Sequence, residues 1–116
     1  MEVINAKRLS IDFSKIKTIG DFHDEMNELF GFPDFYGKNV HALIDCLSSI
    51  RFPSDGMTKI HVDMCEVLII EAMNFSVLEK EIMKIFIFSV EAVNQRSILK
   101  GRSAPLLIEF IEKHAY

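Results

Sequence analysis

Hydrophobic residues repeat at helical spacing in two stretches of the first half of the chain. Thr18 and Asp21 form the pattern of a capping box, and the apolar stripe that follows ends at Gly31, which predicts a first helix. Asn39 is a favourable N-cap residue. After it, apolar residues recur every three or four positions as far as Ile50. This predicts a second helix whose apolar stripe faces a core.

The second half of the chain carries a longer helical pattern. Ser76 and Glu79 are spaced as a capping box, and apolar residues keep the helical period from Leu78 until Gly101 closes the segment. Either one long helix or two shorter ones would fit this pattern.

Strand patterns lie between and around these helices. Candidates near the start are Val3–Asn5 and Leu9–Phe13, and Val67–Ile70 and Leu106–Ile108 are apolar runs typical of strands covered on both faces. Alternation in residues 60–64 is compatible with an extra edge strand. Strands separated by helices imply parallel pairing. We therefore expect an α/β fold with a small three-stranded parallel sheet packed by three to four helices.

The composition fits one domain over residues 1–116. The 116 residues are 49% hydrophobic, enough for a core, and the start of the chain lacks the pattern of a signal peptide. The longest apolar run is too short to cross a bilayer. Cys46 and Cys65 lack the spacing of a metal site, so we expect two reduced thiols in a soluble, cytoplasmic protein.

Negative charge is concentrated before the second predicted helix. Residues 21–34 contain five carboxylates and no Lys or Arg, in a chain whose net charge is -4. This distribution favours a cationic partner and argues against direct binding of nucleic acid. The alternative is that these carboxylates complement their own helix dipole and are otherwise solvated.

Catalytic signals are weak. His61, Asp63 and Cys65 alternate and could be metal ligands, but an exposed strand face would show the same alternation. The histidines are scattered, and no phosphate loop or dinucleotide motif occurs. We therefore predict a binding protein rather than an enzyme, with no cofactor and no metal.

A turn rich in aromatic residues connects the first two predicted helices. Gly31 and Gly37 can adopt backbone angles closed to other residues, and Pro33 restricts the chain between them. In the helix that follows, His41 and Asp45 are four residues apart and share one surface.

The run Phe32–Leu47, FPDFYGKNVHALIDCL in one-letter code, closely resembles the barstar family of intracellular inhibitors of secreted ribonucleases. A weaker similarity extends over most of the chain, and residues 55–58 resemble an insertion in a longer branch of the family. The resemblance implies a barstar-like fold and a non-catalytic protein that blocks a nuclease.

The resemblance also implies roles for individual residues. Asp45 matches the central carboxylate that enters the phosphate pocket of the nuclease; the alternative is an ordinary solvated helix residue. Phe35 and Tyr36 match an aromatic pair of which the first lies against the partner, although one or both could instead cap the core. The full set of predicted partner-binding residues is Asp45, Phe35, Tyr36, Gly37, Asn39, His41, Ile44 and Glu91.

Three positions depart from the family pattern. His41 and Gln95 stand where acids are common, and Ile44 stands where an aromatic residue is common. A histidine beside Asp45 would weaken attraction to a cationic cleft and make it sensitive to pH. These changes favour a nuclease other than barnase as the partner.

Three hypotheses follow. The first is an immunity protein, a monomer when free, that binds a secreted or delivered ribonuclease, barnase-like or another toxin nuclease, and has no membrane partner. The second is a non-inhibitory interaction module on the same fold. The third is a small hydrolase or metal protein that uses His61, Asp63 and Cys65.

Overall fold

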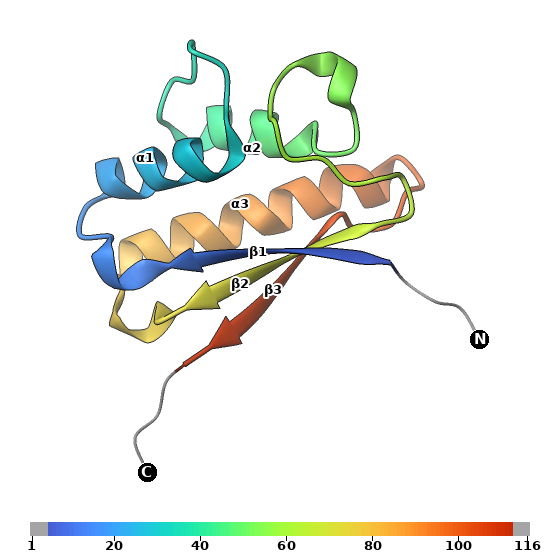
Figure 1. Cartoon of the computed structure of the whole chain (residues 1–116). Helices are drawn as coiled ribbons and strands as arrows, with labels where there is room; N and C mark the ends of the chain where they lie inside the picture. The colour runs from blue at the N-terminus through green and yellow to red at the C-terminus, as the bar shows by residue number, and fades with distance from the viewer. Residues whose placement is uncertain (1–4, 113–116) are drawn as a thin grey trace.

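A parallel sheet of three strands forms one layer of the molecule, and three helices form the other (Figure 1). The computed structural model describes residues 5–112. In chain order the elements are β1 (Ala6–Asp12), α1 (Ile19–Phe30), α2 (Val40–Ser48), β2 (Val67–Met73), α3 (Lys80–Leu99) and β3 (Leu106–Ile111). β2 is central and pairs in parallel with both neighbours, which confirms the predicted fold class.

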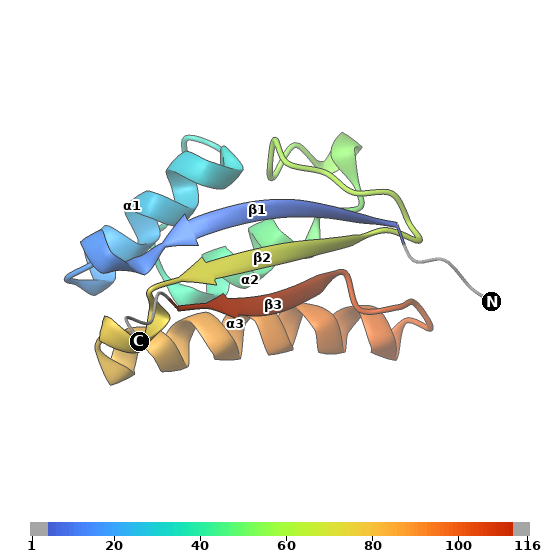
Figure 2. The same cartoon turned by 60° about the horizontal axis from the view of Figure 1, so that its bottom comes forward.

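All three helices cover the same face of the sheet, and the other face is open (Figure 2). Burial alternates along β2, with Leu68, Ile70 and Ala72 buried and the residues between them only partly covered. The expectation that β2 and β3 are covered on both faces is therefore wrong. Among the strand residues, Leu107 is 52% exposed.

Charged residues bridge the three strands. The guanidinium of Arg8 donates to Glu71 at 3.1 Å and to Glu109 at 2.7 Å, and Ser10 donates to Glu71 at 2.7 Å. Ser10, Glu71 and Glu109 are register partners across the three strands, and Arg8 lies two residues before Ser10, which places all four side chains on one face. A polar network therefore occupies the face that no helix covers.

β1 corresponds to the second predicted N-terminal strand. It continues from Ala6 to Asp12, and the chain then turns through a short 3₁₀ segment, η1 (Phe13–Lys15). The competing candidate, Val3–Asn5, lies mostly outside the described residues.

The predicted edge strand at 60–64 does not form, because this segment pairs with helix ends. The N–H of Lys59 donates to the carbonyl of Phe30 at 2.8 Å, and that of Val62 donates to the carbonyl of Ile50 at 3.1 Å. The alternating sequence pattern therefore belongs to a loop in which Val62 is buried between half-buried His61 and exposed Asp63.

The helix ends agree with their sequence signals except at α3. Thr18 and Asp21 form a reciprocal capping box on α1, and Gly31 ends it with a φ of 65°. The predicted box of Ser76 and Glu79 is wrong. Ser76 lies in a separate 3₁₀ turn, η3 (Phe75–Val77), where its N–H and hydroxyl both donate to Glu112, and α3 begins at Lys80 without a side-chain cap.

The core lies between the sheet and the helices. Phe13, Phe75 and Phe86 meet with ring centroids 5.0 to 5.7 Å apart, and Phe22 contacts Phe86. Leu43 and Leu47 of α2 are fully buried, so this helix is fixed in place by its apolar stripe. Within residues 5–112, no helix combines the length and the apolar character needed to span a membrane.

Candidate functional site

The turn between α1 and α2 is anchored by two buried aromatic rings. Phe32 is 7% exposed and stacks on Phe30 with centroids 5.7 Å apart, while Tyr36 packs against Phe32 at 4.8 Å. The N–H of Tyr36 donates to the carbonyl of Pro33 at 2.9 Å. The turn is therefore held from beneath by aromatic packing and closed by a backbone hydrogen bond.

Tyr36 also forms a buried hydrogen bond with α1. Its hydroxyl lies 2.6 Å from Nδ1 of His23, a residue that is only 2% exposed. Burial raises the pKa of Tyr36 above its usual value and lowers the pKa of His23. Both groups are therefore neutral near pH 7. Of the two roles considered for this aromatic residue, Tyr36 caps the core.

Phe35 projects in the opposite sense. The Phe35 side chain is 75% exposed, whereas Tyr36, the next residue in the sequence, is 8% exposed. Beside it lies an open hollow whose other wall is formed by Gly56, Thr58 and Lys59. An exposed ring on a rigid turn is a favourable anchor for a protein partner, because little conformational entropy remains to be lost on binding.

Gly37 and Asn39 join the turn to α2. Asn39 caps the helix by accepting from the N–H of Ala42 at 2.9 Å, and it donates to the carbonyl of Gly37. Gly37 has no positive φ; that geometry falls on Lys38, whose φ is 50°. A Cβ at position 37 would lie 3.0 Å from the side-chain amide nitrogen of Asn39, so a larger residue there would push the capping side chain aside by a few tenths of an ångström.

The outer surface of α2 carries His41 and Asp45, both exposed. The Asp45 side chain is 58% exposed, whereas Ile44 beside it is 5% exposed and belongs to the core. The neighbouring Cys46 is buried, and burial together with the Asp45 charge raises the pKa of its thiol to about 11. Cys46 is therefore a protonated core thiol, and Cys65 is also free.

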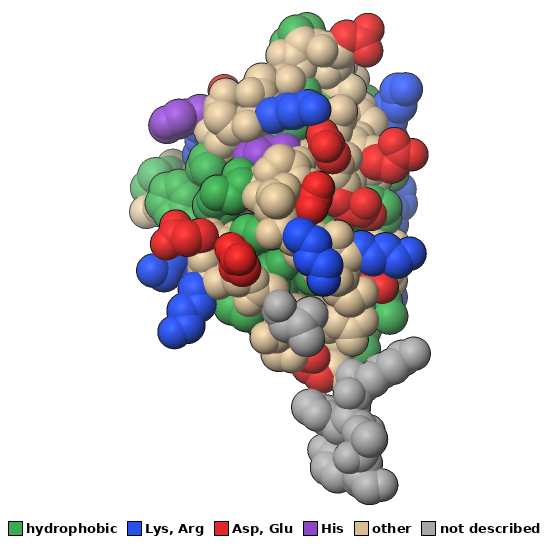
Figure 3. Space-filling model, turned by 90° about the vertical axis from the view of Figure 1, so that its left-hand side faces the viewer, with side chains coloured by type: hydrophobic (Ala, Val, Ile, Leu, Met, Phe, Trp, Pro, Cys, Tyr) green, Lys and Arg blue, Asp and Glu red, His purple; other side chains and the backbone are tan. Residues whose placement is uncertain are grey.

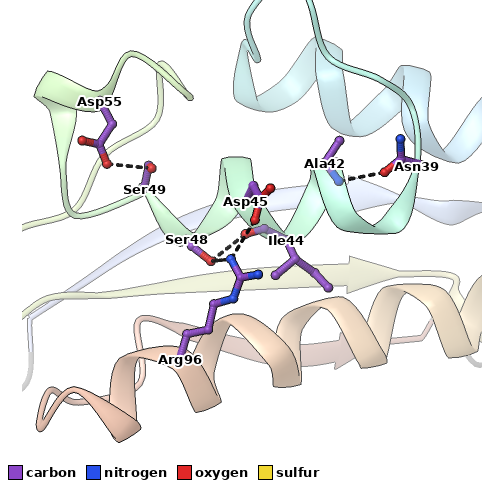
Figure 4. A network of polar contacts seen from close by, with 8 residues as sticks. All are labelled: Asn39, Ala42, Ile44, Asp45, Ser48, Ser49, Asp55 and Arg96. Carbon is purple, nitrogen blue, oxygen red and sulfur yellow. Dashed lines mark hydrogen bonds and ion pairs between the residues drawn. The ribbon is translucent and has the colours of Figure 1, made fainter.

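Asp45 already binds a cation within the molecule. Nη1 of Arg96, on α3, donates to Oδ1 of Asp45 at 2.9 Å and to the hydroxyl of Ser48 at 3.2 Å (Figure 4). Sequence reasoning missed Arg96, because the two residues are 51 positions apart and no local pattern joins them. Glu91 and Gln95 are exposed on the same helix, and in the described part of the chain no polar contact joins either to Asp45.

Acidic side chains also gather at α1. Asp24, Glu25 and Glu28 line a shallow hollow there, and Figure 3 views this side of the molecule, where Lys and Arg side chains lie among the carboxylates. Asp21 accepts from the N–H groups of Lys17 and Thr18, and Asp24 pairs with Lys38 at 2.7 Å. Some of the carboxylates in residues 21–34 therefore stabilise the fold itself, in agreement with the alternative that they complement their own helix.

The geometry offers no support for a metal site at His61, Asp63 and Cys65. The strand that would have aligned these side chains is absent. Residues 5–112 contain no group of three or more His, Cys, Asp or Glu side chains arranged to hold a metal ion.

Two comparisons with known proteins complete the description. Residues 6–106 match the model of the family described as Barstar (barnase inhibitor). The chain is also 38% identical over 42 residues to a Bacillus subtilis (strain 168) protein named "Putative ribonuclease inhibitor YrdF". That alignment covers 36% of this chain and 46% of the relative, so it spans less than half the length of either protein.

Proposed function

Because the chain belongs to the barstar family, we propose that it inhibits a ribonuclease by covering the active site with the turn before α2 and the outer surface of α2. This surface is built from Phe35, Gly37, Asn39, His41 and Asp45, with Glu91 on α3 as a further contact. Buried Tyr36 and Ile44 support it from beneath.

The observation that carries the proposal is the environment of Asp45. Its carboxylate is exposed, lies on a helix fixed by a buried stripe, and already accepts a hydrogen bond from a guanidinium. A ribonuclease cleft concentrates Arg, Lys and His around the scissile phosphate. A rigidly held carboxylate can occupy the phosphate position and block access of RNA.

The other residues of the surface would supply further contacts to the nuclease. Phe35 supplies apolar contact area at the rim, and the neighbouring backbone at Gly37 is exposed for hydrogen bonding. His41 stands close to Asp45 in sequence on the same surface, at a position where an acid is common in the family. This combination would select a partner that differs from barnase.

The proposal describes a binding protein without catalysis. The family model is described as that of an inhibitor, and the buried Cys46 thiol is held protonated. The expected partner is a secreted or delivered ribonuclease that threatens the cytoplasm, where the inhibitor would act. The inhibitor would be a monomer until it meets that enzyme.

The test begins with capture of the nuclease. The tagged full chain is used to pull down partners from its own cells, and the captured enzyme is assayed by cleavage of a fluorogenic RNA. We expect Asp45→Ala to weaken inhibition roughly a hundredfold, because charge-assisted hydrogen bonds in the cleft are lost.

The matched control is Glu81→Ala, which removes one carboxylate from an exposed position at the start of α3. It should leave inhibition within about threefold of wild type, since one exposed charge has little effect on affinity. Equal inhibition by Asp45→Ala and wild type would contradict the phosphate-mimic mechanism.

A second function is favoured by His41, which is exposed within the proposed contact surface at a position where an acid is common in the family. Loss of that acid fits an interaction module that binds a partner other than a nuclease. Capture of a stoichiometric partner without ribonuclease activity, through the Asp45 surface, would favour this function over inhibition.

A further inference from the structure

A small cationic pocket lies where the end of α2 meets the end of α3. Its volume is about 90 Å³, and its polar lining consists of Arg51, Arg96, Lys100, Arg102, Ser48 and Ser97. Four cations from three segments of the chain thus converge on one cavity. The overall charge of the protein is -4, so this concentration does not follow from composition.

The cations in the pocket have few counterions. Arg96 is paired with Asp45 through Nη1. Lys100 and Arg102 form no ion pair with any carboxylate among residues 5–112, and the Arg102 guanidinium instead lies 5.0 Å above the ring of Phe52. The local charge is therefore positive and unbalanced.

Arg51 provides the second observation. It is only 5% exposed. Its two terminal guanidinium nitrogens donate to the carbonyls of Ser103 at 2.6 Å, Glu66 at 2.7 Å and Ala104 at 3.5 Å and to the Ser103 hydroxyl at 3.0 Å, with no carboxylate partner in the described chain. Its Nε is buried and has no hydrogen-bond partner. A buried guanidinium that lacks both a counterion and one hydrogen bond is costly unless an anion compensates it.

We propose that this pocket binds a small oxyanion of the phosphate class. The cavity is large enough to admit a tetrahedral anion, and guanidinium groups bind phosphate oxygens by paired hydrogen bonds. The hydroxyls of Ser48 and Ser97 also line the wall, where they donate to the carbonyls of Ile44 and Ser103, so the guanidinium and ammonium groups supply the donors for the anion. Asp45 does not line the pocket, and none of the residues that do belongs to the proposed nuclease-binding surface, so the proposal stands independently of the inhibitory function.

The test is a titration of the full chain with inorganic phosphate, followed by ¹H–¹⁵N NMR at ionic strength held constant with chloride. We expect saturable shifts at Ser48, Ser97 and the Arg side-chain N–H groups. The double variant Lys100→Gln/Arg102→Gln should weaken phosphate binding roughly tenfold, because two charge-assisted contacts are removed.

The matched control is Lys80→Gln/Lys84→Gln, which removes two positive charges from exposed positions on α3 outside the pocket. It should bind phosphate as wild type does. Shifts that do not saturate, or equal weakening in both double variants, would overturn the proposal.

Two further ligands identify the source of the anion. Acetate that binds more tightly than phosphate would overturn the phosphate assignment in favour of a carboxylate. A nucleoside monophosphate distinguishes a free phosphate from the phosphoryl group of a larger ligand, and saturable binding of either at these residues supports the pocket.

Discussion

Phe35 and Tyr36 are neighbours in the chain whose side chains face opposite surroundings. Tyr36 packs on Phe32 and reaches His23, while Phe35 is 75% exposed. The hydrogen bond that closes the turn from Tyr36 to Pro33 fixes this division. One ring therefore stabilises the turn and the other is available to a partner.

We predict that Phe35→Ala weakens nuclease binding roughly 30-fold, the effect of losing about 2 kcal/mol at an aromatic anchor. The free energy of unfolding should change little, because the side chain is already exposed. Binding is measured by inhibition of the captured nuclease, and stability by urea denaturation.

The neighbouring control is Tyr36→Phe. It removes the hydroxyl that binds His23 and should lower the free energy of unfolding by about 1 kcal/mol while leaving inhibition close to that of wild type. If Tyr36→Phe weakened inhibition more than Phe35→Ala, the assignment of the two rings would be reversed.

His23 makes stability depend on pH. Burial lowers its pKa from 6.5; the nearby charge of Asp24 opposes this shift and that of Lys38 adds to it. Below pH 6.5 the unfolded chain takes up a proton that the native state does not, so stability falls as the pH decreases. Above pH 6.5 both states are neutral at this residue, and its effect disappears.

We therefore predict that the free energy of unfolding of wild type declines between pH 7 and pH 5, and that His23→Gln shows a flatter profile. Urea denaturation at pH 7, 6 and 5 measures both. Asp12 does not confound this window. Its pKa is held at about 2, chiefly by its hydrogen bond with Asn74, so the native carboxylate stays ionised from pH 7 to pH 5. Parallel profiles for the two proteins would refute the assignment.

At the scale of elements, helix ends were predictable wherever their partners are local. Thr18, Asp21 and Asn39 cap helices through residues three positions away, so the sequence alone identifies them. Ser76 fails as a cap because it binds Glu112, 36 positions away. Long-range partners of this kind leave no trace in local spacing.

The same limit applies to the candidate site. Resemblance located Asp45, and the helical period placed it on an outer surface, but neither predicted the guanidinium that Arg96 brings from α3. The helices α2 and α3 therefore meet at a polar contact between exposed residues as well as through the core. A partner that binds Asp45 must compete with that contact or share it.

We predict that Arg96→Gln strengthens nuclease binding by about two- to fivefold, because the partner no longer displaces an internal cation from Asp45. The ion pair is exposed, so its loss should barely change stability. Inhibition titrations at low and high salt measure the effect.

Lys84→Gln is the control, since it also removes one positive charge from an exposed position of α3. Both variants become more negative by the same amount, so general steering toward a cationic enzyme is matched. Weaker binding by Arg96→Gln than by Lys84→Gln would mean that Arg96 orients Asp45 rather than competing for it.

At the scale of the molecule, Arg51 joins the end of α2 to both loops that lead into the sheet. It donates to Glu66, just before β2, and to Ser103, just before β3. The charge pattern of the sequence does not reveal this role, because a single Arg after a helix is usually solvated. Its burial is a property of the assembled fold.

We predict that Arg51→Met lowers the free energy of unfolding by about 3 kcal/mol, because buried carbonyls lose their donor. Arg51→Lys keeps the charge but loses the planar guanidinium with its several donors. Its free energy of unfolding should lie between those of Arg51→Met and wild type. Denaturation with urea measures all three proteins. Equal stability of Arg51→Met and wild type would exclude a stabilising role for these hydrogen bonds.

The parallel pairing of β1 with β2 determines how early in synthesis the sheet can form. β1 begins at Ala6, and its register partner is Val67, so the first strand emerges from the ribosome long before the strand it pairs with. α2 packs against α3, which ends at Leu99 and is therefore synthesised later still. A nascent chain therefore cannot pack the helix that carries Asp45 against α3 until residues as far as Leu99 have been translated, and under the proposed function a chain that is still shorter would give no inhibition.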